Sequence, residues 1–145
     1  MNNEKRRDNR HIGKYISQLY RKGSVFINKE VSKYGISSGQ FMFLLEVYIQ
    51  DGRNQEEISE KLKIDKGTTA RALKKLEEQG FITRVKDEYD KRSNKVYLTD
   101  KAKEIRENVF DVLRDWNHMI SQSLTEEEEE AMEKLLEKVC NNINI

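Results

Sequence analysis

The feature that most constrains this fold is a pair of short helix patterns joined by a very short link. Residues 54–63 (NQEEISEKLK) begin with Asn54, and residues 65–80 (DKGTTARALKKLEEQG) begin with Asp65, and both residue types suit a helix N-cap. Gly80 fits the position just beyond a helix end, where a left-handed backbone is easiest without a side chain. Two helices joined by so tight a turn predict a helix-turn-helix, whose second helix enters the DNA major groove.

The second helix of this pair is expected to be apolar on one side and polar on the other. Ala70, Leu73 and Leu76, with Ala72 beside them, recur at helical spacing and predict a buried stripe. The polar residues expected to face away from that stripe and to contact DNA are Lys66, Thr68, Thr69, Arg71, Lys74 and Lys75. Hydroxyls and an arginine near the helix start can contact base edges, and the lysines can neutralise phosphates. A merely solvated face would carry similar charge, so the neighbouring segments decide the interpretation.

After Gly80 the sequence pattern changes from helical to extended. Residues 81–85 and 95–98 are rich in β-branched and aromatic residues, and the polar run KDEYDKRSN between them predicts a hairpin with a long tip. A hairpin directly after a helix-turn-helix is a wing, and a basic wing can place a guanidinium in the DNA minor groove. The wing residues assigned to DNA binding are Arg84, Lys86, Asp90, Lys91 and Arg92. We expect Arg92 to enter the groove and Asp90 to orient a neighbouring guanidinium.

This arrangement resembles the winged helix of the MarR (multiple antibiotic resistance regulator) family. Similarity covers roughly residues 12–140 and is strongest over residues 36–99, which include the segments ISSGQFMFL and LLEVYIQDGRNQ. Asp90-Lys91-Arg92 matches the family's acidic-x-Arg wing signature, whereas Ala102 stands where family members often have Gly. The resemblance implies a mainly α fold with a small β wing and a homodimeric DNA-binding regulator, more often a repressor than an activator.

The terminal segments hold more apolar side chains than a small winged helix can cover. Residues 11–34 predict a long helix, loosened at Gly23. Thr99 is placed to cap a second long helix over residues 100–124, and Thr125 a last helix after it. A large uncovered apolar stripe indicates another layer or another subunit. Because the resembled family pairs its terminal helices, residues 8–34 and 100–145 are assigned to dimerisation and residues 36–99 to DNA binding. Such a dimer would present two recognition helices to successive major grooves of a pseudo-palindromic operator.

The net charge of +1 hides a segmental distribution. Residues 61–95 contain eleven Lys or Arg and six Asp or Glu, whereas residues 99–145 contain six and twelve. A basic middle attracts phosphates, and an acidic C-terminal part keeps the rest of the molecule away from a polyanion. This favours double-stranded DNA over the main alternative, a winged-helix protein-interaction module that has no need of a basic helix and wing. An RNA-binding winged helix would differ in preferring single strands to duplexes.

A small-molecule effector is the second half of the mechanism that the resemblance implies. In that family, small aromatic or anionic molecules bind between the dimer helices and the winged helix and alter the distance between the recognition helices. Aromatic residues that could line such a pocket are His11, Tyr15, Tyr48 and Trp116, although each type is more often ordinary core. The sequence identifies neither the effector nor the operator.

Catalytic and metal chemistry find little support in the sequence. The histidines are His11 and His118 and the cysteine is Cys140, and no spacing among them resembles a metal-ligand set. Phosphate-cradling glycine loops and nucleophile motifs are also missing. No apolar run approaches the length of a membrane span, and the charged start MNNEKRRDNR lacks the apolar segment of a signal peptide. We therefore expect a cytoplasmic protein with no catalytic residues, metal or cofactor.

Overall fold

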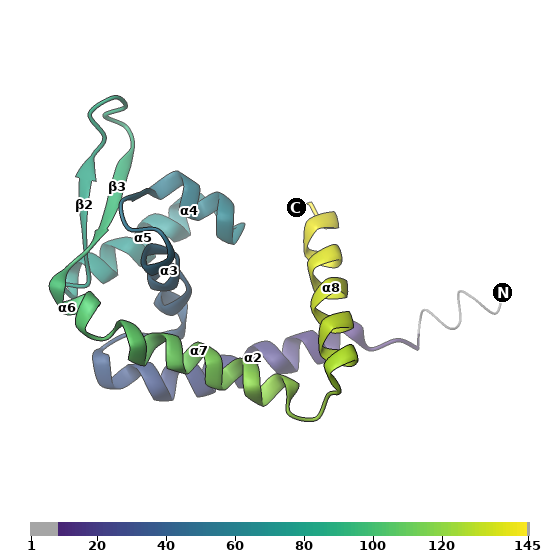
Figure 1. Cartoon of the computed structure of the whole chain (residues 1–145). Helices are drawn as coiled ribbons and strands as arrows, with labels where there is room; N and C mark the ends of the chain where they lie inside the picture. Colours follow the sequence, from purple (N-terminus) through teal and green to yellow (C-terminus); the bar gives the residue numbers. More distant parts are fainter. Residues whose placement is uncertain (1–8, 145) are drawn as a thin grey trace. The chain divides into compact units, whose positions relative to one another are not determined.

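The computed structural model describes residues 9–144 and shows a chain of helices with one small sheet (Figure 1). The helical elements and strands, in chain order, are α2 Ile12–Val31, η1 Ser32–Tyr34, α3 Ser38–Ile49, β1 Arg53–Asn54, α4 Gln55–Leu62, α5 Lys66–Glu78, β2 Ile82–Lys86, β3 Asn94–Leu98, α6 Asp100–Glu104, α7 Arg106–Ser121 and α8 Glu126–Asn142. The described residues fall into two compact units, which divide between Val112 and Leu113. The predicted fold class, mainly α with a small β wing, is confirmed.

Helix α3 forms the centre of the first unit. Phe41, Leu44 and Val47 are almost completely buried, and the helix packs against α2, α5 and β3. Burying one large apolar side chain contributes about 1.5–3 kcal/mol to folding. Ser37 begins the helix in a capping box with Gln40. The central helix is therefore a fixed support for α4, α5 and the sheet.

The turn between α4 and α5 is built from local hydrogen bonds. Asn54 caps α4 by accepting a bond from the backbone N–H of Glu56 at 2.8 Å, and Asp65 caps α5. Between them Lys63 adopts a left-handed conformation with φ 54°, and the N–H of Ile64 donates to the carbonyl of Ser59 at 3.0 Å. The predicted helix-turn-helix is confirmed, with the first helix one residue shorter than the pattern suggested.

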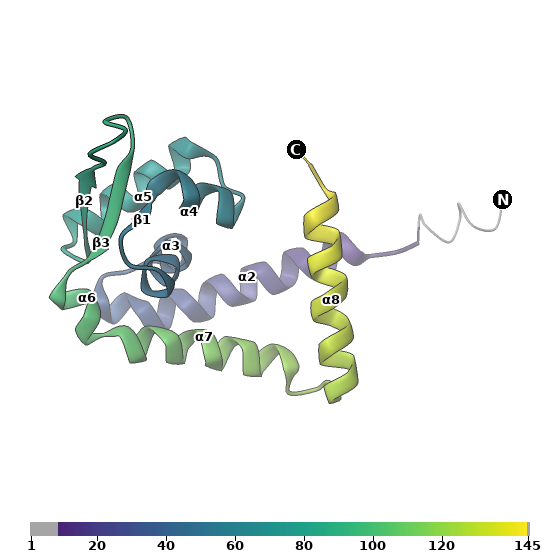
Figure 2. The same ribbon diagram turned by 45° about the horizontal axis from the view of Figure 1, so that its top comes forward.

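The sheet is antiparallel and has the order β1-β3-β2, which Figure 2 shows beside α4 and α5. Strands β2 and β3 form the expected hairpin, with Arg84 opposite Val96. The two-residue strand β1 was not predicted, because two residues are too short to show a period. Arg53, on β1, donates a hydrogen bond to the buried carboxylate of Glu46 on α3, so this ion pair fixes the sheet to the central helix.

Two details of the long helices differ from the sequence pattern. We expected one helix from residue 100 to about residue 124, but the structure breaks it at Ile105, between α6 and α7. We also expected a loosening at Gly23, but α2 continues through this residue, which is buried. Thr99 and Thr125 cap α6 and α8 as predicted. No helix in the described part of the chain is both long and apolar enough to span a membrane.

The terminal helices expose much of their apolar surface. On the first half of α2 the side chains of Tyr15 and Tyr20 are 59% and 76% exposed, whereas Val31 near its end is buried. Within the second unit, Leu135 and Val139 on α8 are 61% and 45% exposed. The core of each unit therefore leaves these side chains without cover.

Candidate nucleic-acid interface

The buried side of α5 differs from the prediction at one residue. Thr69 was expected on the polar face, but it has 0% exposure and continues the buried stripe through Leu73 and Leu76, four and seven residues later. Its hydroxyl donates to the backbone carbonyl of Asp65 at 2.9 Å, so burial leaves no unpaired polar group. Ala70 and Ala72 are half-buried beside this stripe. Thr69 therefore anchors the helix, and its assignment to the exposed face is wrong.

The opposite side of α5 carries the predicted cations. Lys66, Arg71, Lys74 and Lys75 are exposed, and Thr68 is half-buried at the helix start. The N-cap residue Asp65 already places a carboxylate at the helix start and occupies the backbone N–H of Thr68, so the exposed cationic side chains, and not the helix end, supply the attraction for an anion. The geometry of this face suits contact with a phosphate backbone.

Asp65 organises the start of α5 more extensively than a cap requires. Its Oδ1 accepts from the backbone N–H of Thr68 at 2.8 Å, and its Oδ2 accepts from the Thr68 hydroxyl at 2.7 Å. Arg71 donates from Nη2 to the same hydroxyl at 3.2 Å. The bond from the Thr68 backbone, helped by the hydroxyl, lowers the pKa of Asp65 below its ordinary value. Sequence reasoning identified Asp65 as a cap only; the spacing Asp65-x-x-Thr68 was the available signal for the rest.

The tip of the wing is shaped by two aspartates that bind backbone N–H groups two residues later. Asp87 accepts from the N–H of Tyr89 at 2.9 Å, and Asp90 accepts from the N–H of Arg92 at 3.0 Å. Asp90 was expected to orient a neighbouring guanidinium, but it fixes the loop that carries Arg92 by accepting from the backbone N–H of Arg92. Lys91 and Arg92 are both exposed at this tip, as predicted.

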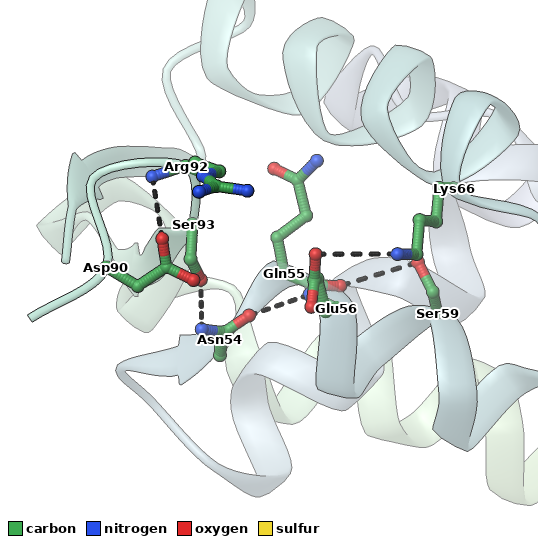
Figure 3. Close-up of polar contacts among 8 residues, drawn as sticks. All are labelled: Asn54, Gln55, Glu56, Ser59, Lys66, Asp90, Arg92 and Ser93. Atoms are coloured by element: carbon green, nitrogen blue, oxygen red, sulfur yellow. Dashed lines mark hydrogen bonds and ion pairs between the residues drawn. The ribbon is translucent and has the colours of Figure 1, made fainter.

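The end of the wing loop, at Arg92 and Ser93, and the start of α5 both lie beside the first turn of α4 (Figure 3). Asn54 donates from Nδ2 to the Ser93 hydroxyl, which ties the wing to α4. The Arg92 side chain points toward Gln55, and Lys66 Nζ lies 3.6 Å from Glu56 Oε1. A small cavity of about 80 Å³ is lined by Gln55, Glu56, Ser59, Lys66, Arg92, Ser93 and Asn94. The structure therefore brings together one cation from the recognition helix and one from the wing.

Arg84 has a different environment from the other predicted wing residues. Its side chain is only 19% exposed, and Nη2 lies 3.2 Å from Glu77 Oε1 on α5. Its Nη1 also donates to Gln55 at 3.4 Å, and its backbone N–H donates to Glu77 at 3.1 Å. The hydrogen bond from Arg84 lowers the pKa of Glu77 below its ordinary value of 4.5. Arg84 therefore holds β2 against the recognition helix, whereas Lys86 is exposed.

The four effector candidates lie in different environments. Tyr48 is core: it is 5% exposed, its hydroxyl donates to the carbonyl of Ala102, and burial raises its pKa to about 12. His11, the N-cap residue of α2, and Tyr15 on α2 are exposed, and Trp116 is half-buried in the second unit. Among the described residues no group of three or more His, Cys, Asp or Glu is arranged to hold a metal ion.

Known proteins resemble this chain in both sequence and fold. The sequence pattern of the MarR family matches residues 36–94. YybA, an uncharacterized HTH-type transcriptional regulator of Bacillus subtilis (strain 168), is 38% identical over 120 residues, which are 80% of this chain and 77% of YybA.

Two solved structures support the same relationship. A MarR transcriptional regulator from Methanosarcina mazei Go1 matches with a TM-score of 0.82 and 44% identity over 90% of this chain and 94% of that one. A mutant MarR from E. coli complexed with operator DNA matches with a TM-score of 0.78 and 27% identity, over 88% and 92% of the two chains. With a helix-turn-helix, a basic wing and these relatives, the chain belongs to the MarR family of transcriptional regulators.

Proposed function

We propose that this protein binds a pseudo-palindromic double-stranded DNA operator as a homodimer and represses transcription there. The observation that carries the proposal is the convergence of Lys66 and Arg92, one from the recognition helix and one from the wing, beside the cationic face of α5. A helix face for the major groove and an arginine for the minor groove are two different DNA-reading devices on one surface.

The residues have different roles in this interface. Thr68 and Arg71, at the start of α5, contact base edges, where each good contact pair discriminates by about 1–3 kcal/mol. Phosphates are neutralised by the lysines Lys66, Lys74, Lys75, Lys86 and Lys91. Arg92 enters the minor groove, and Asp90 fixes the loop beneath it. Thr69 and Arg84 support the helix and the wing from inside, because both have internal partners.

The apolar side chains exposed on the terminal helices support the homodimer. Tyr15 and Tyr20 on α2 and Leu135 and Val139 on α8 are exposed although they are large and apolar. A second copy of the chain would cover these side chains, and its twofold symmetry would place two recognition helices one DNA turn, about 34–36 Å, apart. Residues 8–34 and 100–145 are accordingly proposed as the dimerisation region; residues 8 and 145 themselves lie outside the described residues.

Repression that a small aromatic or anionic effector relieves is the finer part of the proposal. Membership of the MarR family supports it, since an effector that prefers one spacing of the two recognition helices would shift operator affinity. Adding a panel of small aromatic acids to the operator complex tests this part. An effector must lower operator affinity at a fixed salt concentration; if none of the panel does so, the effector part lacks support.

Selection of duplexes from a random pool tests the DNA-binding proposal directly. Purified protein should enrich a pseudo-palindrome whose half-sites are about ten base pairs apart, and its affinity should fall steeply as salt is raised, because bound phosphates release counterions. Single strands should compete poorly, which separates this protein from an RNA-binding winged helix. Recovery of unrelated sequences with no symmetry would contradict the proposal.

A further inference from the structure

The hydroxyl of Thr68 has two protein partners before any DNA is bound. It donates to Asp65 Oδ2 over 2.7 Å, and it accepts from Arg71 Nη2 over 3.2 Å. The direction of the first bond follows from chemistry: an ionised carboxylate can only accept, so the hydroxyl must supply the hydrogen. Asp65 is ionised at neutral pH, since its pKa lies below the ordinary value of 3.8.

Counting the bonding capacity of Thr68 shows what remains for a ligand. A hydroxyl has one hydrogen and two lone pairs. Asp65 takes the hydrogen and Arg71 occupies one lone pair, so one lone pair and the methyl group are left. The remaining lone pair can accept a hydrogen bond from a base but cannot donate one.

The major-groove edges of the bases differ in this respect. Adenine and cytosine carry amino groups that donate, whereas guanine and thymine present only acceptors, together with the thymine methyl group. An acceptor-only hydroxyl can bond to the amino groups of adenine and cytosine. Opposite a guanine it would place two acceptors face to face, which leaves both without a hydrogen.

We infer that Asp65 is a specificity-determining positioning residue, which fixes the Thr68 hydroxyl as an acceptor and thereby selects adenine or cytosine, and rejects guanine, at the base that Thr68 faces. This inference rests on the proposed function, since it concerns how the same surface reads its operator. Asp65 itself acts through Thr68 and Arg71 and need not touch DNA.

An ordinary N-cap explains only part of this arrangement. Capping needs one carboxylate oxygen, and Oδ1 fulfils that role by binding the Thr68 backbone N–H. The second oxygen is bonded to the side chain that faces outward. Gly67 shows how tightly the group is packed: a Cβ there would lie 3.3 Å from Asp65 Oδ1 and 3.4 Å from Arg71 Nη1. A side chain at residue 67 would contact both charged groups and would fit tightly against Asp65.

The decisive variant is Asp65→Asn, because asparagine caps a helix as well as aspartate does. Its Oδ1 can still bind the Thr68 N–H, but its Nδ2 would donate to the Thr68 hydroxyl in place of accepting from it. The hydroxyl hydrogen would then be free to donate to guanine or thymine. Asp65→Ser is a second variant, since serine also caps but its side chain is too short to hold the Thr68 hydroxyl as well.

Binding is measured with the duplex enriched from the random pool and with its derivatives that carry each of the four bases at every half-site position. The full-length protein should prefer adenine or cytosine over guanine at one position by roughly five- to tenfold, the ratio expected for one hydrogen bond. Asp65→Asn and Asp65→Ser should abolish or reverse that preference. Helical content and thermal unfolding must stay at the level of the unsubstituted protein.

Two controls separate base selection from general charge. Glu56→Gln removes another exposed carboxylate from the same surface, beside Lys66, and should raise affinity for every duplex alike without moving the base preference. Thr68→Val removes the hydroxyl and retains the shape, so adding Asp65→Asn to it should change no base preference.

The outcomes are distinguishable. If Asp65→Asn and Asp65→Ser leave the base preference at every position unchanged, the inference is overturned while the proposed function stands. If the unsubstituted protein already prefers guanine at the position that responds to Thr68→Val, the inference is also overturned. If no duplex is selected at all, the proposed function fails first, and this inference fails with it.

Discussion

Two regions of the molecule present different kinds of side chain at their surfaces: α5 with the wing presents polar ones, and the terminal helices present apolar ones. On α5, apolar side chains such as Leu73 are buried, and on the wing polar side chains such as Arg84 and Asp90 are held by directional bonds. On the first half of α2 and on α8, large apolar side chains such as Tyr20 and Leu135 face outward. Hydrogen bonds and ion pairs are directional and fix the position of individual atoms, whereas exposed apolar surface is stabilised by any complementary surface that buries it. The first region is suited to reading a sequence and the second to self-association.

Truncating one leucine in each region gives the largest expected contrast. Leu73→Ala should lower the free energy of unfolding by about 2–5 kcal/mol, because it leaves a cavity in the core. Leu135→Ala should cost much less in dilute protein, since that side chain is largely exposed within its own chain. Urea unfolding at low and high protein concentration measures both. Equal losses for the two variants at low concentration would remove the distinction between the regions.

Placing charge on α8 should separate self-association from folding. The double substitution Leu135→Asp and Val139→Asp should convert the dimer to a monomer, because two charges cannot be buried unpaired in an apolar interface. Affinity for a two-half-site duplex should fall about 100-fold or more as the avidity of the second half-site is lost. Sedimentation and DNA binding are the measurements.

The matched control for this substitution is Lys138→Asp, which changes the charge of α8 without removing an apolar side chain. It should remain dimeric. A double variant that stays dimeric would show that α8 does not contribute to the association.

Arg92→Ala should act on the other region alone. We expect operator affinity to fall by about 1–3 kcal/mol, because a guanidinium in the minor groove is lost, with folding and association unchanged. Lys91→Ala is the neighbouring control. It should lower the affinity for all duplexes similarly and should reduce the slope of log affinity against log salt concentration by about one, because one phosphate contact is lost. Affinities compared at one fixed salt concentration check this, and an unchanged affinity for Arg92→Ala would remove the wing from the interface.

The smallest expected effect is on folding stability, and it concerns the ion pair between Glu77 and Arg84 that holds the wing to α5. Because the pKa of Glu77 is lowered in the folded protein, its ionised form contributes stability that is present above the ordinary carboxyl value of 4.5 and is lost as pH falls below it. Glu77→Gln should therefore be less stable than the unsubstituted protein at neutral pH, with the difference shrinking toward pH 3. Glu78→Gln, on the same turn of α5, is the matched control. Urea midpoints across this pH range would disagree with the assignment if Glu77→Gln and Glu78→Gln behaved alike.

Most of the fold could be predicted because its signals are local. Caps such as Asp65 and Thr125 act over three residues, and helical or alternating periods appear within a few turns or strand residues. The sequence placed Asp90 on the wing but gave it the wrong partner: it was expected to orient a guanidinium, and it bonds to a backbone N–H two residues away. The exposed lysines of α5 followed from the same periodicity. Thr69 was assigned to the exposed face because its side chain is polar, although its spacing to Leu73 and Leu76 places it on the buried stripe. A threonine hydroxyl can be buried there because it bonds to a carbonyl of its own helix.

By itself, the sequence determined the order of the elements, the ends of most helices, the basic recognition helix and wing, and the family to which the protein belongs. Tertiary structure alone decided which polar side chains are internal: Arg84 is bound to Glu77, Arg53 to Glu46, and Asn54 to Ser93. The physical reason is the separation of the partners, which are between 7 and 39 residues apart and meet only after the sheet has packed against the helices. Local spacing identifies a charge that is able to bind DNA, but only the folded chain decides whether that charge already has a partner.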